Sequence, residues 1–287
     1  MSSNNIKKYF LKFYSLIPFF LFVSIFLYLL FSSSNFLKER SLLKILFSSN
    51  WKPIKGEFGF FTFWFSTFYV TILSAFIFIP MGLLISIYIS EYASKKLKNF
   101  LKPFFDVLSA IPSVVFGLWG FTVIVPFVSS LGNILGISSS GYSILSASIV
   151  LSLMVLPFMI SLSIGVFEMV PFSLKESVLS LGATKFEMVE KVLIPKCKKG
   201  LVASIFLSFG RAIGETMAVM MVVGCTTKVP KTPFDPAYPI PALIANEFGE
   251  MMSVTSYREA LLFSAFLLNL IVLIFHFLFR KVLLKGY

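Results

Sequence analysis

Long runs of apolar residues, separated by short charged segments, make up most of this chain. The runs with little or no charge cover residues 13–37, 58–90, 107–167, 201–224 and 260–279. A helix needs about 20 mostly apolar residues to cross a bilayer, because it rises about 1.5 Å per residue through about 30 Å of hydrocarbon. The run 107–167 is long enough for two helices, and its polar stretches 129–133 and 138–141 predict a tight turn between them. The pattern therefore predicts an all-α polytopic membrane protein with six transmembrane helices.

The composition agrees with a membrane protein and excludes other classes. Hydrophobic residues make up 57% of the chain, charged residues only 13%, and the mean hydropathy is +0.90. Soluble proteins have about 25% charged residues, so a soluble enzyme, a disordered chain and a disulfide-rich scaffold are all excluded. Cations before the first run leave a cleaved signal peptide as an alternative. We expect a retained span instead, because the run is long for a signal peptide and no A-x-A site follows it.

The net charge of +12 arises from cations at the ends of the apolar runs rather than from one basic patch. Such cations orient helices and meet anionic headgroups, so we expect membrane lipid and no nucleic acid as a partner. Sixteen Lys and Arg residues lie on the side shared by both termini, and eight lie on the other. The positive-inside rule therefore predicts a multi-pass protein of the cytoplasmic membrane with both termini in the cytoplasm. The segment after the first run, residues 38–55, is more basic than this rule favours.

The residues that could carry enzymatic chemistry are few. Cys197, Cys225 and His276 are too few and too dispersed for a metal site, so we expect no metal and no cofactor. The nucleotide-binding pattern G-x4-G-K-[ST] is absent from the sequence, so any ATP hydrolysis must take place on another chain. A membrane-embedded enzyme stays a weaker alternative, because it needs a cluster of nucleophiles, bases or ligands inside the spans.

A polar loop over residues 171–200 carries two helix-start signals. Ser173 to Glu176 has the S-x-x-E spacing of a capping box, and Thr184 to Glu187 repeats it. Gly182 between them predicts a helix stop in the left-handed conformation, and Pro195 predicts a second stop. The loop should therefore form two short helices with a sharp elbow. Val178, Leu179 and Leu181 have no evident partner within the loop, so they either rest on lipid headgroups or enter a groove on another protein.

The same loop resembles the EAA loop of ATP-binding-cassette (ABC) importer permeases, whose pattern is E-A-A-x3-G-x9-I-x-L-P. Glu176 and Gly182 match it, Ser177 and Val178 replace the two alanines, and Val192-Leu193-Ile194-Pro195 closes it. In that family the loop is a coupling helix that docks on a cytosolic ATPase. The resemblance thus implies ATPase-coupling residues, namely Glu176, Ser177, Gly182, Ala183 and Pro195.

Two charged residues interrupt the fifth apolar run. Arg211 lies ten residues beyond Leu201, about 15 Å along a helix and near the middle of a bilayer. Glu215 is expected one turn further on the same face. A charge at mid-membrane costs about 2.5–3.5 kcal/mol, so both side chains should face the bundle interior or a wet path. Two interpretations remain open: a structural ion pair, or a fixed cation for an anionic solute, since guanidinium binds oxyanions through two parallel hydrogen bonds.

The string around these charges, residues 210–224 (GRAIGETMAVMMVVG), resembles the fifth-span signature of the PstC-type permeases of phosphate-specific ABC importers. Residues 108–118 (LSAIPSVVFGL) look like the third-span motif of that family, and residues 240–250 (IPALIANEFGE) are similar to its last outer loop. The resemblance runs from about Thr67 to the C-terminus. Cys225 departs from it, because the family commonly has a polar amide there.

The resemblance implies a type I ABC importer permease with a MetI-like fold. It places an N-terminal tail, a first helix and an outer loop in residues 1–59 and the permease core in residues 60–287. It implies a translocation pathway that includes Arg211, Glu215, Thr216 and Ser113. The implied partners are a PstB-type ATPase dimer, a PstA-type sister permease and a PstS-type binding protein that delivers phosphate. A permease for another oxyanion, such as sulfate or molybdate, remains the alternative.

Overall fold

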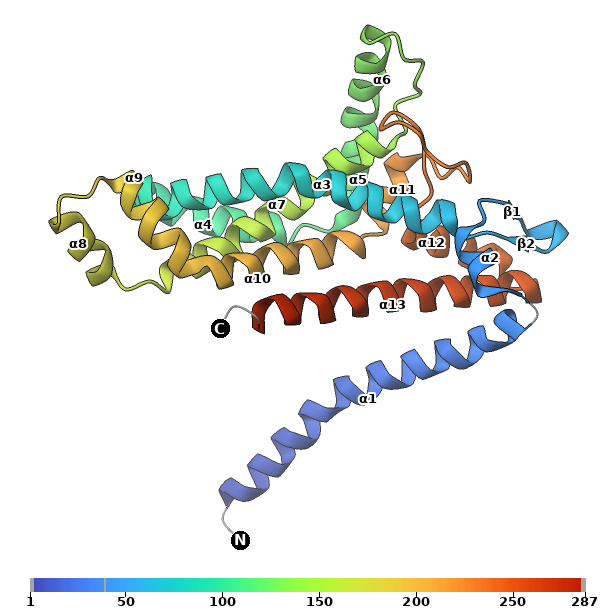
Figure 1. Cartoon of the computed structure of the whole chain (residues 1–287), viewed down its shortest axis with the longest axis horizontal. Coiled ribbons are helices and arrows are strands. Elements are labelled where there is room, and N and C mark those ends of the chain that lie inside the picture. Colours follow the sequence, from blue (N-terminus) through green and yellow to red (C-terminus); the bar gives the residue numbers. More distant parts are fainter. Residues whose placement is uncertain (1–2, 39, 285–287) are drawn as a thin grey trace. The chain divides into compact units, whose positions relative to one another are not determined.

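The computed structural model describes residues 3–38 and 40–284 and consists almost entirely of helices (Figure 1). Strands β1 (Trp51–Lys52) and β2 (Glu57–Phe58) form a short antiparallel hairpin, in which Trp51 pairs with Phe58. The chain divides into two compact units. Met1–Phe61 and Ile244–Ile271 form the first unit, and Thr62–Leu243 and Val272–Tyr287 form the second.

Five helices in the described residues are long and apolar enough to cross a membrane, and six if one bent pair is counted as a single span. The five are Leu16–Ser34, Phe61–Tyr92, Ser113–Ile134, Ile144–Glu168 and Thr255–Lys281, and the bent pair joins Lys185–Ile213 to Met217–Val223. An α-helix satisfies all its backbone hydrogen bonds internally, which lipid cannot do for it. The predicted all-α architecture with six spans is therefore confirmed when the bent pair is one of them.

The first unit is built around helix α1 (Ser3–Lys38), the short helix α2 (Leu42–Phe47), the 3-10 turn η1 (Pro53–Lys55) and the hairpin. Phe36, Phe60 and Phe263 pack against one another in its interior with ring centroids 5.1–6.3 Å apart. Gly59 allows two backbone segments to approach closely, because a Cβ atom at this position would lie 2.4 Å from the carbonyl oxygen of Ser48. Aromatic packing thus holds the loop after α1 in a fixed shape.

The second unit packs its helices around α7, which is apolar all round and more than half buried. Its elements are α3 (Phe61–Ile87), η2 (Tyr88–Tyr92), α4 (Lys95–Ser109), α5 (Ser113–Trp119), η3 (Gly120–Ile124), α6 (Val125–Ile134), α7 (Ile144–Glu168), α8 (Phe172–Ser180), α9 (Lys185–Glu187), η4 (Met188–Leu193), α10 (Ile194–Ile213) and α11 (Met217–Val223). The segments η2, η3 and η4 are π-helical. Helices α12 (Ile240–Met251) and α13 (Thr255–Leu284) each continue from one unit into the other.

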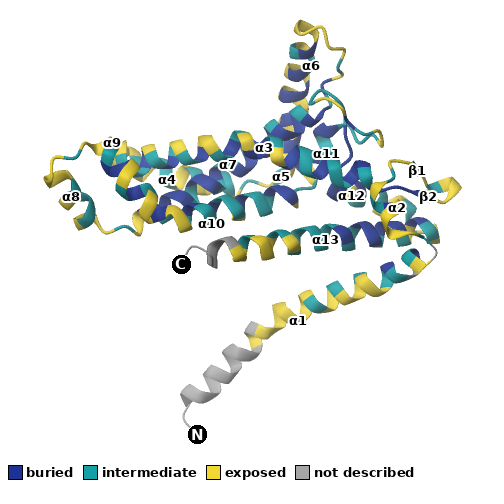
Figure 2. Ribbon diagram, in the orientation of Figure 1, coloured by how far each residue is buried: buried dark blue, intermediate teal, exposed yellow. Residues whose placement is uncertain are grey.

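Burial within the second unit is uneven. The core contains Val150, Leu151 and Met154 of α7, each at most 1% exposed. Helix α8 carries only exposed and partly exposed residues, as the yellow and teal ribbon in Figure 2 shows. A helix with so few partly buried residues gains little stability from packing on its own chain.

The prediction that the third span starts near residue 107 was wrong. Helix α4 ends at Ser109, and the helical span begins at Ser113 after a break that contains Pro112. Proline has no N–H to donate and disfavours helical geometry in the residue before it, so the break follows locally. A search for uncharged runs does not detect such a break, because both flanking segments are apolar.

The turn predicted from the polar stretches 129–133 and 138–141 is half correct: residues 129–133 lie inside α6, whereas residues 138–141 lie in the non-helical segment 135–143 that links α6 to α7. Ser130 bonds the carbonyl of Pro126 within the helix, and Ser129 donates to the carbonyl of Ser139 at 2.9 Å. Serine hydroxyls that find carbonyl partners can remain in a helix, so polar residues alone did not mark its end.

Candidate functional site

The fifth span is broken where its two charges lie. Helix α10 ends at Ile213 and α11 begins at Met217, with a 60° bend between the two helices. Gly214 closes α10. Arg211 occupies the last turn of α10, whereas Glu215 lies in the unwound segment. The prediction that both side chains share one helical face was therefore wrong, because the helix stops between them.

Arg211 is half-buried and contacts two other helices. Its Nη2 donates a hydrogen bond to the carbonyl oxygen of Ser109, the last residue of α4, at 3.2 Å. Its guanidinium carbon lies 5.0 Å from the ring centroid of Phe158 on α7. A cation is favoured at the carbonyl end of a helix and over an aromatic face. The guanidinium thus lies where α4 and α10 both end.

Glu215 faces the other half of the broken helix. Its Oε1 accepts the backbone N–H of Ala218 in the first turn of α11 at 3.3 Å, which caps that helix. Glu215 also lines a narrow crevice together with Thr67 and Thr71 of α3. Among the ion pairs between described residues, none joins Arg211 to Glu215. The structural ion pair that was left open is thus absent from this conformation.

The other two predicted pathway residues lie at the same two breaks. The hydroxyl of Thr216 donates to the carbonyl of Gly214 at 3.4 Å. Ser113 is half-buried and opens α5, directly after the break that follows α4. Helices α5 and α11 pack closely at Gly117, where a Cβ atom would lie 3.0 Å from Cα of Ala218. The structure thus brings together the broken third and fifth spans, which sequence reasoning had treated separately.

Sequence reasoning missed the two partners of Arg211. The carbonyl of Ser109 is a backbone group, which no residue type reveals, and Phe158 is one of 36 phenylalanines. The available signal was Pro112, which predicts free carbonyl groups in the turn before it. A cation elsewhere in the span region could then have been matched to them.

The first helix of the coupling loop begins earlier than predicted. Helix α8 starts at Phe172 with Pro171 as its N-cap, and it has no side-chain cap. The proposed capping box of Ser173 and Glu176 is therefore wrong; the Ser173 carbonyl accepts a hydrogen bond from the hydroxyl of Ser177 at 2.8 Å. Proline at φ −57° is already preorganised for a helix start, so the helix gained residues at its N-terminal end.

The elbow and the second capping box are confirmed. Gly182 follows α8 with φ +85°, in the left-handed region that glycine adopts at low cost. The backbone N–H of Thr184 donates to Oε2 of Glu187 at 3.0 Å, and the N–H of Glu187 donates to the Thr184 hydroxyl at 3.2 Å. Ala183 between them is half-buried.

Pro195 does not end the second helix. Helix α9 continues through η4 into α10, and Pro195 lies in the first turn of α10. The π-helical turn over Met188–Leu193 makes the backbone hydrogen bonds span one more residue directly before the proline. A wider turn accommodates a residue without an N–H, so the chain stays helical where an α-helix would break.

The loop exposes several large apolar side chains. Leu181 is 87% exposed and Phe172 71% exposed, and Leu179 and Phe186 are exposed as well. Val178 instead packs on a cluster that includes Phe167, so it does have a partner within the chain. The polar predicted residues Glu176 and Ser177 lie exposed on α8.

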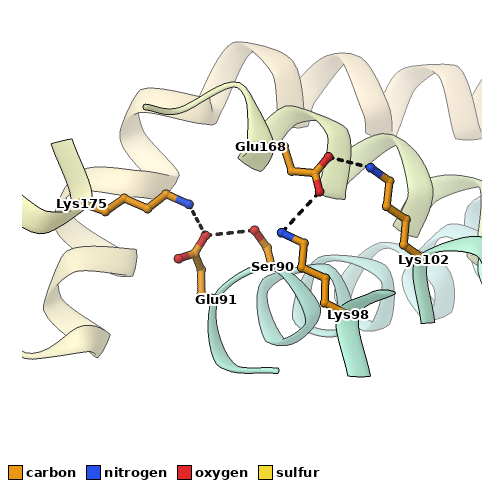
Figure 3. A network of polar contacts seen from close by, with 6 residues as sticks. All are labelled: Ser90, Glu91, Lys98, Lys102, Glu168 and Lys175. Carbon is orange, nitrogen blue, oxygen red and sulfur yellow. Dashed lines mark hydrogen bonds and ion pairs between the residues drawn. The ribbon is translucent and has the colours of Figure 1, made fainter. Parts of the chain in front are cut away.

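A network of ion pairs joins the base of this loop to the spans (Figure 3). Lys175 of α8 pairs with Glu91 of η2, and the hydroxyl of Ser90 donates to the same carboxylate at 2.9 Å. Lys98 and Lys102 of α4 converge on Glu168 at the end of α7, at 3.3 and 2.7 Å. Glu91 and Lys175 are 84 positions apart, so their pairing could not be recognised from the sequence.

Comparison with known proteins places this architecture in a family. The family described as "Binding-protein-dependent transport system inner membrane component" matches residues 79–283. The probable ABC transporter permease protein YqgH of Bacillus subtilis is 37% identical over 83% of this chain and 75% of its own length. The phosphate transport system permease protein PstC of Xylella fastidiosa is 32% identical over 85% and 79%. PstC of Haemophilus influenzae is 34% identical over 71% and 70%.

Solved structures show the same fold at low sequence identity. A chain of the MetNI methionine ABC transporter in an inward-facing conformation aligns with a TM-score of 0.61 and 19% identity, over 78% of this chain and 94% of that chain. A chain of a bacterial alginate ABC transporter aligns with a TM-score of 0.65 and 16% identity, over 97% and 95%. The predicted type I importer fold is thereby confirmed. This chain belongs to the family of binding-protein-dependent transport system inner membrane components, the multi-span permease subunits that work with an ATPase and a substrate-binding protein in ABC importers.

Proposed function

We propose that this chain is a PstC-type permease subunit that forms half of the translocation path of an ATP-driven phosphate importer. Two PstC relatives and the 210–224 string support phosphate as the solute. The observation that carries the proposal is a half-buried Arg211 where α4 and α10 both end. An uptake subunit for sulfate or molybdate has the same fold and is the competing proposal.

The geometry around Arg211 suits weak, reversible binding of an oxyanion. Guanidinium has five N–H donors, and the hydrogen bond to Ser109 uses one of them. The hydroxyl of Ser113 lies at the break after α4 and provides a further donor, whereas the hydroxyl of Thr216 must leave the carbonyl of Gly214 to do so. Unwound helix segments of this kind hold solutes in many transporters, because their free backbone groups line the path. The negative charge of Glu215 partly offsets the positive charge of Arg211. The site therefore does not hold the anion too tightly, which assists release.

Energy for import comes from a separate chain in this proposal. The exposed side chains of α8 and the elbow form the surface for an ATPase, with Glu176, Ser177, Gly182, Ala183 and Pro195 as the coupling segment. The partners are a PstB-type ATPase dimer, a PstA-type sister permease and a PstS-type binding protein. Both termini and α8 lie on the cytoplasmic side, and residues 1–59 precede a permease core of residues 60–287.

Uptake of labelled phosphate by proteoliposomes that contain the whole complex and its binding protein tests this function. Unlabelled phosphate should compete with the label far better than sulfate or molybdate does. Arg211→Ala should reduce uptake at least tenfold in a complex that still assembles, since charge-assisted hydrogen bonds are worth about 1.5–3 kcal/mol each. Normal uptake by this variant would refute the pathway, and preferential competition by sulfate or molybdate would refute the solute.

A further inference from the structure

We propose that the Glu91–Lys175 pair transmits movement of the coupling helix α8 to helix α3, so that both residues position the walls of the pathway. This inference rests on the proposed ATPase coupling. The pair lies outside the residues already assigned to the pathway or to the coupling segment. Figure 3 shows Lys175 reaching from α8 toward Glu91 at the end of the second span.

The Glu91–Lys175 pair is largely buried. The Glu91 side chain is 5% exposed and the Lys175 side chain 14% exposed, on an otherwise open α8. A buried ion pair usually contributes little net stability, because desolvation offsets the attraction between the charges. Loss of one partner is costly, however, since it leaves the other charge buried and unpaired. Such a pair therefore fixes a geometry more than it stabilises a fold.

Helix α8 has few other contacts with the spans. Val178 packs on the Phe167 cluster, and every other residue of α8 except Leu174 and Lys175 is exposed. Lys175 is thus the polar contact that holds this helix to the spans. The neighbouring pairs of Lys98 and Lys102 with Glu168 are about one-third exposed and join α4 to α7. They resemble the first pair in chemistry but do not involve α8.

The span that carries Glu91 also lines the crevice beside Glu215. Glu91 lies in the π-helical η2, which continues α3 as one span from Phe61 to Tyr92. The same span carries Thr67 and Thr71, which line the crevice beside Glu215. Twenty residues of helix separate Thr71 from Glu91, or about 30 Å. The span between them is continuous, although Pro80 removes one hydrogen bond from its ladder, so a push at Glu91 can reach Thr71 along a single helical segment.

Helix α8 is joined to the opposite wall by the chain itself. The elbow at Gly182 leads through α9 and η4 into α10, which ends beside Arg211. An ATPase that moves α8 would therefore displace both walls, α10 through the backbone and α3 through the ion pair. Without the pair, α3 would be moved only through apolar contacts of Leu83 and Ile87 and through the contact of Tyr92 with Lys185, so its displacement would be smaller.

The test uses the whole complex and measures phosphate imported per ATP hydrolysed. Glu91→Gln and Lys175→Met should each lower this ratio at least tenfold, while ATP hydrolysis continues and the ATPase still co-purifies. The swapped variant Glu91→Lys with Lys175→Glu should recover at least half of the normal ratio. The matched control Lys102→Met, in the neighbouring network, should stay within twofold of the unchanged protein. An unchanged ratio in both single variants would overturn the proposal, as would a swapped variant that assembles but remains uncoupled.

A second measurement does not depend on the solute. In a variant with Cys197 and Cys225 replaced by serine, Thr71→Cys introduces a single thiol on α3. The rate at which this thiol is labelled, with and without ATP, reports movement of α3. ATP should change the rate at least threefold in the otherwise unchanged protein and less than 1.5-fold with Glu91→Gln. An ATP response that survives Glu91→Gln would overturn the proposed transmission. Loss of that response together with sulfate-selective uptake would instead refute only phosphate as the solute.

Discussion

Gly182 allows a test in which backbone conformation is separated from side-chain size. Its φ is +85°, and a Cβ atom built on it would have nothing within 4 Å. The cost of Gly182→Ala is thus conformational alone, about 1–2 kcal/mol for a residue other than glycine in the left-handed region. A penalty of this size changes the population of the elbow by a factor of about 5–30. Alanine should therefore reduce phosphate imported per ATP by a factor of this order, and valine no less.

Two further variants make this test decisive. Gly182→Asn should retain most of the coupling, because asparagine enters the left-handed region more easily. Gly136→Ala is the matched control, since Gly136 has φ +72°, also has open space around it, and lies away from α8. Uptake and ATP hydrolysis measured on reconstituted complexes give the ratio for each variant. If Gly182→Ala couples as well as Gly136→Ala does, the role of the elbow is refuted.

Three more predictions concern local packing, capping and charge. Gly117→Ala should lower the unfolding temperature in detergent, because the added Cβ would lie 3.0 Å from the α11 backbone, at a cost of about 1–3 kcal/mol. The control Gly165→Ala should leave the unfolding temperature unchanged, because a Cβ there has nothing within 4 Å. Equal shifts in the two variants would contradict the close packing. Thr184→Ala should speed amide exchange at the start of α9, because it removes a cap that stabilises the helix by about 0.5–2 kcal/mol. Thr184→Ser keeps the hydroxyl and should leave exchange unchanged. Slow exchange in the alanine variant would refute the cap. Burial raises the pKa of the Asp235 carboxyl, but hydrogen bonds from the backbone N–H groups of Thr232 and Lys231 outweigh burial and hold this pKa below 3.8. The carboxylate therefore stabilises this turn at neutral pH, and the stabilisation is lost as the pH falls through the lowered pKa. Asp235→Asn should then speed exchange of these amides at pH 7, and an unchanged rate would exclude this role.

The sequence predicted the overall architecture better than the ends of its helices. Apolar runs predicted the spans because run length is set by membrane thickness. Helix ends were less predictable: Pro171 started α8 early, and Pro195 was absorbed by the π turn η4. The signal of Pro195 was recognised but assigned the wrong consequence, and Pro171 was not considered as a helix start, since local alternatives differ by only a few kcal/mol.

Site prediction followed the same division. Arg211 and Glu215 could be recognised because a charge inside an apolar run is costly wherever it points. Their mutual arrangement could not be recognised, because the break at Gly214 turns the second half of the span by 60°. Residues Thr67 and Thr71, which face Glu215 across the crevice, carried no signal at all, since hydroxyls are frequent in membrane helices.

The sequence by itself determined the class of protein, the number of spans, the positions of the intramembrane charges, and the elbow with its second capping box. These features depend on hydrophobicity, chain length and nearest-neighbour hydrogen bonds, which are local. Only the tertiary structure decided which groups meet. It paired Arg211 with the carbonyl of Ser109, 102 positions away, and Lys175 with Glu91, 84 positions away. Such pairings arise from how helices pack against each other, and many packings are compatible with the same apolar faces.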